Sequence, residues 1–355
     1  MRFRALPSLL LAFFIGCSGA VRNESPPGVD AAVDAPGALP DSGVAPLDAP
    51  ARVELGSMTL ARSLLGASAA PDGRIRVFNG VTIAGVSSSM ETYDPKTNIW
   101  SRGVSASTSR YGHATATDSS GNVYVLGGTT DGSNPIASVE MYSPATDSWT
   151  AIADLPTARL GLGAAFGSDK KLYTMGGRTR DGVPSNLVEV YSPDTKNWSK
   201  AASMPTSRFS LSIVKAVDGR LFAIGGRDAE PIPTPMSVVE VFDTTKGAWS
   251  VGPTLKLARY WFGATLGNDA RVYVAGGIGD SGFLDDVEVL DQAGGGWTAL
   301  QSMPEARAWI ASALGSDGRI FVLGGAKGPS ASTPPPLPTM LAFDPTANTW
   351  SSMTR

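Results

Sequence analysis

Short apolar runs recur along the chain at a regular interval, and each run closes on a pair of glycines. Five runs share this form: VYVLGG at 123–128, LYTMGG at 172–177, LFAIGG at 221–226, VYVAGG at 272–277 and IFVLGG at 320–325. IRVFNG at 75–80 is a sixth copy, in which Asn79 replaces the first glycine. Glycine accepts a positive φ without a Cβ penalty, and Asn is the best substitute for it. The pattern predicts six strands that each end in a sharp turn.

Two further marks keep the same period. Six tryptophans lie 48 to 53 residues apart, and each follows an aromatic residue or Leu by seven positions: Trp100, Trp149, Trp198, Trp249, Trp297 and Trp350. An arginine stands ten residues after each of the first five tryptophans, at Arg110, Arg159, Arg208, Arg259 and Arg307, and Arg62 opens the series. A unit of about 50 residues with four short strands is typical of one β-propeller blade. We therefore expect an all-β, six-bladed propeller over 51–355, with four antiparallel strands per blade and repeats starting near 62, 110, 159, 208, 259 and 307.

The second repeat illustrates how one unit builds one blade. We expect the innermost strand over 111–117, the second over 122–126, the third over 138–142 and the outermost around Trp149. Tyr142 and Trp149 bracket the turn between the last two strands, where their rings are expected to pack between adjacent sheets and to bury on the order of 150–250 Å² each. This interpretation makes the six periodic tryptophans structural residues.

Arginine, Gly-Gly, aromatic and tryptophan positions repeat in the same order and at the same spacing over 52–355. This pattern resembles the kelch repeat family. The resemblance implies a kelch propeller, in which arginines at the start of the innermost strands line the axial pocket in some members. It does not imply one activity, because kelch propellers include enzymes, cytoskeletal proteins and ligase adaptors.

The arginines come with a partner series in the third strands. Five glutamates keep the phase: Glu91, Glu140, Glu189, Glu240 and Glu288. A repeated Arg–Glu pair is most simply an ion pair that ties strands or blades together. The sixth unit has Leu341 at the Glu position, which predicts that one arginine of the ring is free to meet a ligand.

Two tryptophans lie outside the six-fold series, each two residues after a blade arginine. Trp261 and Trp309, with Tyr260 and Tyr111, are predicted to place aromatic faces near the propeller axis. Planar rings beside arginines suit a sugar ring or an extended peptide. The candidate ligand-binding residues are therefore Trp261, Trp309, Tyr260, Tyr111, Arg259, Arg307 and Arg62. The alternative is that both tryptophans plug the channel where other blades carry Leu64, Gly112, Gly161 or Ser210.

Composition narrows the chemistry that the chain can perform. The net charge of -3 and the sequence pI of about 5.3 give no basic surface for nucleic acid. His113 is the single histidine and Cys17 the single cysteine, so we expect no metal site built from these ligands and no cofactor. A Ser-His-Asp triad through His113 is conceivable, but SRYGHAT at 109–115 favours a histidine packed under the blade.

The first residues are typical of an export signal rather than of a folded unit. MRFR carries two positive charges, and ALPSLLLAFFIG is an apolar stretch too short to span a bilayer. Residues 1–17 end in FIGC, which resembles a bacterial lipobox and predicts lipidation of Cys17; cleavage after Ala20 is the alternative. Residues 18–50 are rich in Ala, Asp and Pro and carry five acidic residues against one arginine, which predicts a disordered tether with a net charge of -4.

Two segments of the chain could supply the outer strand of the sixth blade and so close the ring. RVELGSM at 52–58 and NTWSSM at the C-terminus both align with the outer strand of the sixth blade, so we expect the two ends to lie side by side there.

These features favour a monomeric, exported and lipid-anchored kelch propeller of the cell envelope, at the outer membrane or cell surface. We expect it to bind a protein or glycan without catalysis. The alternative is a carbohydrate-active enzyme, either a sugar mutarotase or epimerase or a lyase, because such chemistry needs only an Arg, an acid and a pocket.

Overall fold

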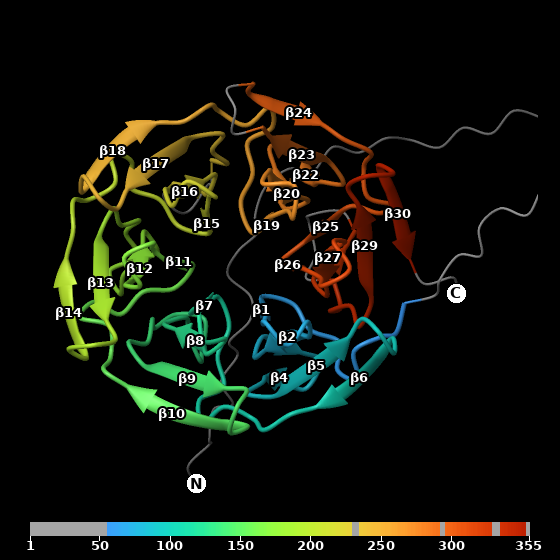
Figure 1. Ribbon diagram of the computed structural model, residues 1–355, viewed down its shortest axis with the longest axis horizontal. Helices are drawn as coiled ribbons and strands as arrows, with labels where there is room; N and C mark the ends of the chain where they lie inside the picture. The colour runs from blue at the N-terminus through green and yellow to red at the C-terminus, as the bar shows by residue number, and fades with distance from the viewer. Residues whose placement is uncertain (1–54, 229–233, 292–294, 329–333, 353–355) are drawn as a thin grey trace, which may run out of the picture. The chain divides into compact units, whose positions relative to one another are not determined.

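The computed structural model of the chain describes residues 55–228, 234–291, 295–328 and 334–352. All of them lie in the second of two compact units, Glu54–Arg355. Every regular element within them is a strand. Six four-stranded antiparallel sheets stand around a common axis as the blades of a propeller (Figure 1). The six-bladed propeller with four antiparallel strands per blade, predicted from the repeats, is confirmed.

Each blade runs in chain order from its innermost to its outermost strand. Blade 1 holds β1 (Gly66–Ala69), β2 (Ile75–Phe78), β5 (Met90–Asp94) and β6 (Ile99–Arg102). Blade 2 holds β7 (Ala114–Thr117), β8 (Val123–Leu126), β9 (Val139–Ser143) and β10 (Ser148–Ile152). Blade 3 holds β11 (Gly163–Phe166), β12 (Leu172–Met175), β13 (Val188–Ser192) and β14 (Asn197–Lys200).

The second half of the ring repeats this order. Blade 4 holds β15 (Ser212–Lys215), β16 (Leu221–Ile224), β17 (Val239–Asp243) and β18 (Ala248–Val251). Blade 5 holds β19 (Gly263–Leu266), β20 (Val272–Ala275), β23 (Val287–Leu290) and β24 (Trp297–Ala299). Blade 6 holds β26 (Ala311–Leu314), β27 (Ile320–Leu323), β29 (Met340–Asp344) and β30 (Thr349–Ser352).

Three two-stranded ribbons lie outside the six blade sheets. They pair β3 (Val81–Thr82) with β4 (Gly85–Val86), β21 (Ile278–Gly279) with β22 (Gly282–Phe283), and β25 (Arg307–Ala308) with β28 (Ala326–Lys327).

The strand bounds predicted for blade 2 can be compared with those in the structure. The innermost strand of this blade begins at Ala114, three residues later than expected, because Tyr111 instead bridges to Thr129 and Gly112 has a positive φ of 59°.

The core lies between neighbouring blades, because the second strand of every blade is buried at all four positions. The periodic tryptophans close these interfaces from outside. Trp198 pairs across the strands with Tyr191, their ring centroids are 5.2 Å apart, and its indole N–H donates to the Ala153 carbonyl before blade 3 at 2.9 Å. The other five make the equivalent bond, at 2.7–3.0 Å. The structural interpretation of this series is confirmed.

The glycine pairs join each blade to the next. The amide of Gly128 donates to the Arg159 carbonyl of blade 3 at 2.9 Å. A Cβ at Gly127, which has φ 62°, would lie 2.6 Å from the same oxygen, so the position requires glycine. The equivalent bond recurs around the ring and closes it between Gly325 of blade 6 and Arg62 of blade 1 at 2.9 Å. Asn79 adopts φ 55° in blade 1, as its place in the sequence pattern predicts.

The ring closes without exchanging a strand. The C-terminal segment forms β30, which pairs with β29 as the outer strand of blade 6. Of the competing segment, 52–54 lie outside the described residues and 55–58 form no strand. The Met58 amide donates to the Pro338 carbonyl of blade 6 at 3.0 Å, and the Gly56 carbonyl accepts from Trp100 of blade 1 at 3.0 Å. The first described residues therefore lie where blade 6 meets blade 1, beside the blade that holds the C-terminal strand (Figure 1).

Candidate functional site

The blade arginines are engaged inside the protein. In blades 1 to 5 each guanidinium meets the third-strand glutamate at 2.5–2.7 Å, with both side chains buried: Arg62–Glu91, Arg110–Glu140, Arg159–Glu189, Arg208–Glu240 and Arg259–Glu288. The second guanidinium nitrogen of Arg159 donates to the Gly176 carbonyl at the end of β12. Burial lowers the pKa of Arg159, and the charge of Glu189 opposes this effect. All five pairs connect the segment before the first strand with the third strand. In blades 2, 3 and 5 the arginine also donates to the glycine turn, whereas Arg62 donates to the Asn79 carbonyl and Arg208 to the Ala223 carbonyl within β16.

Blade 6 pairs its arginine in a different way. Arg307 is bonded to Glu305, two residues earlier in the chain, and the other oxygen of the same carboxylate accepts from Lys327 at 2.9 Å. Arg307 also donates to the Gly324 and Thr339 carbonyls. The expectation that the absence of a glutamate at Leu341 leaves one arginine free is therefore wrong, because Glu305 supplies the carboxylate from the preceding loop.

The residues two positions after the blade arginines form a ring around the axis. Each of the six has a positive φ between 51° and 62°: Leu64, Gly112, Gly161, Ser210, Trp261 and Trp309. Each amide donates to the carbonyl of its neighbour in the preceding blade, at 2.7–3.3 Å, and the series closes from Leu64 back to Trp309. Six peptide groups thus make a continuous hydrogen-bonded ring at the inner end of the blades. We call these six residues the axial ring.

The two additional tryptophans are neighbours in the axial ring, since the Trp309 amide donates to the Trp261 carbonyl at 3.0 Å. The indole of Trp261 reaches across the axis, because a Cβ on Gly112 of blade 2 would lie 3.2 Å from its outermost carbon. Trp309 instead packs edge-on against Phe283, with ring centroids 5.2 Å apart. The absence of a side chain at Gly112 therefore leaves room for the Trp261 ring. Trp261 covers part of the channel and is partly exposed.

A cavity of about 180 Å³ lies on the axis beside this ring. It is lined by the entry to every innermost strand: residues 64–67, 112–115, 161–164, 210–213, 261–264 and 309–312. Among the seven candidate residues, the cavity brings together Trp261 and Trp309 only. Arg62, Arg259 and Arg307 do not line it and stay buried within their blades. As ligand contacts, these three arginines are thus a poor fit to the geometry.

Tyr260 and Tyr111 stand one residue before the axial ring and also do not line the cavity. Tyr260 is buried, and its ring lies 5.2 Å from the guanidinium carbon of Arg227. The hydroxyl of Tyr111 rests against Gly132, where an added Cβ would be only 2.5 Å away, and burial raises the pKa of this tyrosine. Both tyrosines belong to the packing of the loops after the glycine pairs.

His113 faces the same cavity from blade 2. Its side chain is 9% exposed, and its Nε2 would lie 2.6 Å from a Cβ on Gly66 of blade 1. Burial, aided by the charge of Arg110, lowers the pKa of His113 to about 3, so the imidazole is neutral at physiological pH. A catalytic triad through His113 has no support in the geometry, because neither imidazole nitrogen has a hydrogen-bond partner among the described residues.

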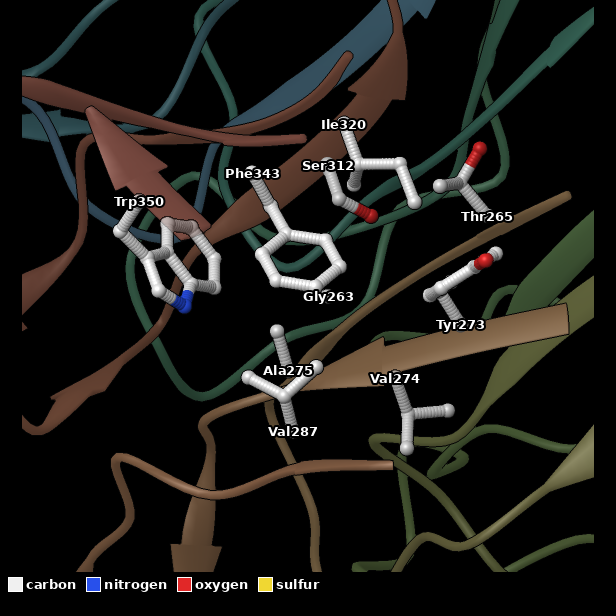
Figure 2. Close-up of a pocket in the computed structure, with 10 residues that line it drawn as sticks. All are labelled: Gly263, Thr265, Tyr273, Val274, Ala275, Val287, Ser312, Ile320, Phe343 and Trp350. Carbon is white, nitrogen blue, oxygen red and sulfur yellow. The ribbon is translucent and has the colours of Figure 1, made fainter. Parts of the chain in front are cut away.

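A second, much smaller void of about 10 Å³ lies between blades 5 and 6 (Figure 2). Apolar side chains dominate its lining, with Val287, Ile320, Phe343 and Trp350 around it. A cavity of this volume holds at most about one water, so it is a packing gap and not a ligand site.

The described residues contain no group of three or more His, Cys, Asp or Glu side chains placed to hold a metal ion. No helix in the part of the chain that the structure describes is long and apolar enough to cross a membrane. Cys17 and the predicted signal and tether, 1–17 and 18–50, lie outside the described residues.

Comparison with known protein families matches most of this ring. A model of the KLHDC2/KLHL20/DRC7 kelch-repeats domain matches residues 163–355, and the kelch motif matches residues 109–156. The chain belongs to the kelch-repeat family. Among solved structures, that of YjhT is similar to this kelch propeller with a TM-score of 0.70, over 84% of this chain and 99% of the YjhT chain, at 16% sequence identity. A likeness at this identity shows the fold alone, and no match is found among the curated proteins. Membership of the kelch-repeat family suggests a binding or scaffold role.

Sequence reasoning missed one ion-pair partner in this kelch propeller. Glu305 does not repeat at the position of the other glutamates, and the available signal was its place two residues before Arg307. The alignment of the blade arginines placed Ser210 at the same position as the two tryptophans, but it did not show that Ser210, Ser312 and His113 line one axial cavity from blades 4, 6 and 2.

Proposed function

We propose that the chain is an exported, lipid-anchored kelch propeller of the bacterial cell envelope that binds a protein or glycan through its axial face without catalysis. The observation that carries the proposal is the pair Trp261 and Trp309, which stand side by side in the axial ring. Four of the six ring positions hold Leu, Gly, Gly and Ser, so the fold does not require an indole there. A partly exposed aromatic surface around a pocket is typical of ligand-binding sites.

The test of this proposal is a glycan and envelope-component array probed with the full-length chain and with a Trp261→Ser, Trp309→Ser double variant. Ser210 already occupies the same ring with φ 56°, so serine fits the backbone at both positions. The matched control is Val251→Ser, which removes a large apolar side chain that is 88% exposed on the outer strand β18, away from the axis.

The proposal expects specific binding that the double variant loses and the control keeps, with little change in melting temperature for either. Equal binding by the double variant and the wild type would reject the axial face as the binding surface. Incubation with any ligand found distinguishes binding from the enzyme alternative: an unchanged ligand supports a binding protein, and a new product peak supports a sugar-modifying enzyme.

The anchor is tested separately. Cys17→Ala is expected to release the protein from the membrane fraction, because a lipidated cysteine at the end of the signal would supply the attachment. A Cys17→Ala protein that still sediments with membranes would defeat the lipoprotein part of the proposal and leave the ligand-binding part standing.

A further inference from the structure

The glycine at position 112 of the axial ring is not required by the backbone. All six ring residues have a positive φ, and four of them carry a side chain at that φ: Leu64, Ser210, Trp261 and Trp309. A Cβ added to Gly112 would lie 3.2 Å from Cη2 of the Trp261 indole, and its next neighbours would be 3.8 and 3.9 Å away, at ordinary van der Waals distance. The indole, and not the chain geometry, therefore excludes a side chain from position 112.

Trp261 reaches Gly112 from the opposite side of the ring. Trp261 precedes the innermost strand of blade 5 and Gly112 that of blade 2, and these blades stand opposite each other among the six (Figure 1). A side chain that starts at one blade and contacts the other therefore spans the axial ring along a diameter. The axial cavity begins at this ring and continues along the first residues of the innermost strands, so the indole lies across the end of the cavity.

The backbone at Trp261 is strained. A positive φ is uncommon for residues other than glycine, and a bulky residue at φ 51° is an outlier. Strained residues of this kind gather at active sites and ligand-binding sites. Glycine or serine occupies the equivalent place in blades 2, 3 and 4, so closing the ring does not require an indole. The indole is also partly exposed, unlike a side chain that only fills a core.

The axial cavity is small for a ligand of the proposed kind. Its volume of about 180 Å³ is below the roughly 300–1,000 Å³ of pockets that enclose drug-sized molecules. Because the Trp261 indole lies across the end of this cavity, a glycan or a protein segment on the axial face meets the indole before it reaches the cavity. An exposed indole face is a surface on which sugar rings and peptide groups pack well.

We propose that Gly112 is a positioning residue of the binding site on the axial face. Its missing side chain lets the Trp261 indole lie across the ring, where the indole forms the floor that the ligand contacts and keeps the ligand out of the axial cavity. Tryptophans at the centre of an interface commonly dominate its binding energy. This inference rests on the proposed function and adds that blades 2 and 5 build the site together.

The test compares binding of the full-length wild type and of ring variants to the glycan and envelope-component array. Gly112→Ala adds one methyl group against the indole, and Gly112→Leu, which copies blade 1 at φ 52°, fills the place of the indole. The matched control is Gly161→Ala at φ 62°, which carries the same backbone strain but whose added Cβ has Ser210 and Phe209 as its nearest neighbours. Trp261→Ser copies blade 4 and removes the floor altogether.

Gly112→Leu is expected to weaken array binding about tenfold or more, Gly112→Ala to weaken it by less, and Gly161→Ala to leave it unchanged within about twofold. Trp261→Ser is expected to weaken binding as much as Gly112→Leu does, and the two substitutions combined to weaken it no further, because both act on one indole. For the same reason Gly112→Leu is expected to lower the melting temperature of the wild type by more than that of Trp261→Ser.

Array binding that Gly112→Leu keeps, while the Trp261→Ser, Trp309→Ser variant loses it, would overturn the positioning role and uphold the proposed function. Tighter binding by Trp261→Ser would place the ligand inside the cavity and overturn the role of the indole as a floor. An equal loss in Gly161→Ala, or equal melting shifts from Gly112→Leu in both backgrounds, would overturn the assignment to this one contact. An array to which the wild type does not bind would overturn the proposed function, and this role with it.

Discussion

Replacing His113 by Leu changes how the stability of the propeller depends on pH. The native imidazole is held neutral, mainly by burial and also by the charge of Arg110, with a pKa of about 3 against an ordinary value of about 6.5. Because the unfolded chain binds a proton below pH 6.5 and the folded chain does not, acid favours unfolding. The stabilisation linked to this histidine is complete above pH 6.5 and is lost progressively as the pH falls towards 3.

The size of the effect follows from the pKa difference. Each pH unit between the two pKa values costs about 1.4 kcal/mol, so lowering the pH from 7 to 5 removes about 2 kcal/mol through His113 alone. His113→Leu lacks this loss, and at neutral pH it also removes two unpaired buried nitrogens. The variant is therefore expected to be at least as stable as the wild type at pH 7 and to gain about 2 kcal/mol relative to it at pH 5.

The assay is urea unfolding of both proteins at pH 7, 6 and 5, followed by tryptophan fluorescence. His113 is the only histidine in the chain, and the carboxylates titrate in both proteins, so the difference between the two curves isolates this one group. Tag-free protein is required. If the free energies of unfolding of the two proteins fell in parallel between pH 7 and 5, the buried neutral imidazole would be refuted.

Three further substitutions test the blade framework. Glu189→Ala is expected to destabilise by about 3–5 kcal/mol in urea unfolding, because it leaves Arg159 charged and buried without its partner, and a change under about 1 kcal/mol would contradict the role of the pair. Glu305→Ala is expected to lower the free energy of unfolding by clearly less than Glu189→Ala, since Glu305 is 28% exposed and water reaches the Arg307 guanidinium more easily once the carboxylate is removed. An equal loss of stability would show that the arginine of blade 6 is as closed to water as that of blade 3. Gly127→Ala is expected to lower stability by about 2 kcal/mol or more, through its positive φ and the clash with the Arg159 carbonyl, and an unchanged melting curve would argue against that contact.

The repeated residues predicted the architecture well because each has the same structural task in every blade. The glycine pairs and the outer tryptophans bond to equivalent groups of their own or a neighbouring blade, and five of the six blade arginines meet the third-strand glutamate, so a fixed spacing in sequence maps to a fixed place in space. The role of Asn79 could be predicted for the same reason, since its position requires only a residue that accepts a positive φ.

The candidate site was less predictable because its residues come from different blades and make contacts that do not repeat from blade to blade. Trp261 and Trp309 were recognised as additions to the series, but the contact between Trp261 and Gly112 joins blades 5 and 2 and has no signal in spacing. Arg62, Arg259 and Arg307 do not line the axial cavity, and the sequence could not show this because whether a guanidinium faces the axis or the blade depends on packing. Glu305 shows the same limit: a carboxylate from another point of the chain replaced the missing third-strand partner of Arg307.

The central claim, that the propeller binds its ligand on the axis, is tested most directly by calorimetric titration of the wild type and of the Trp261→Ser, Trp309→Ser variant with a ligand that the array identifies. The account predicts saturable binding by the wild type that the variant loses while it keeps the wild-type melting temperature. Equal binding by the two proteins would place the ligand elsewhere and contradict the account.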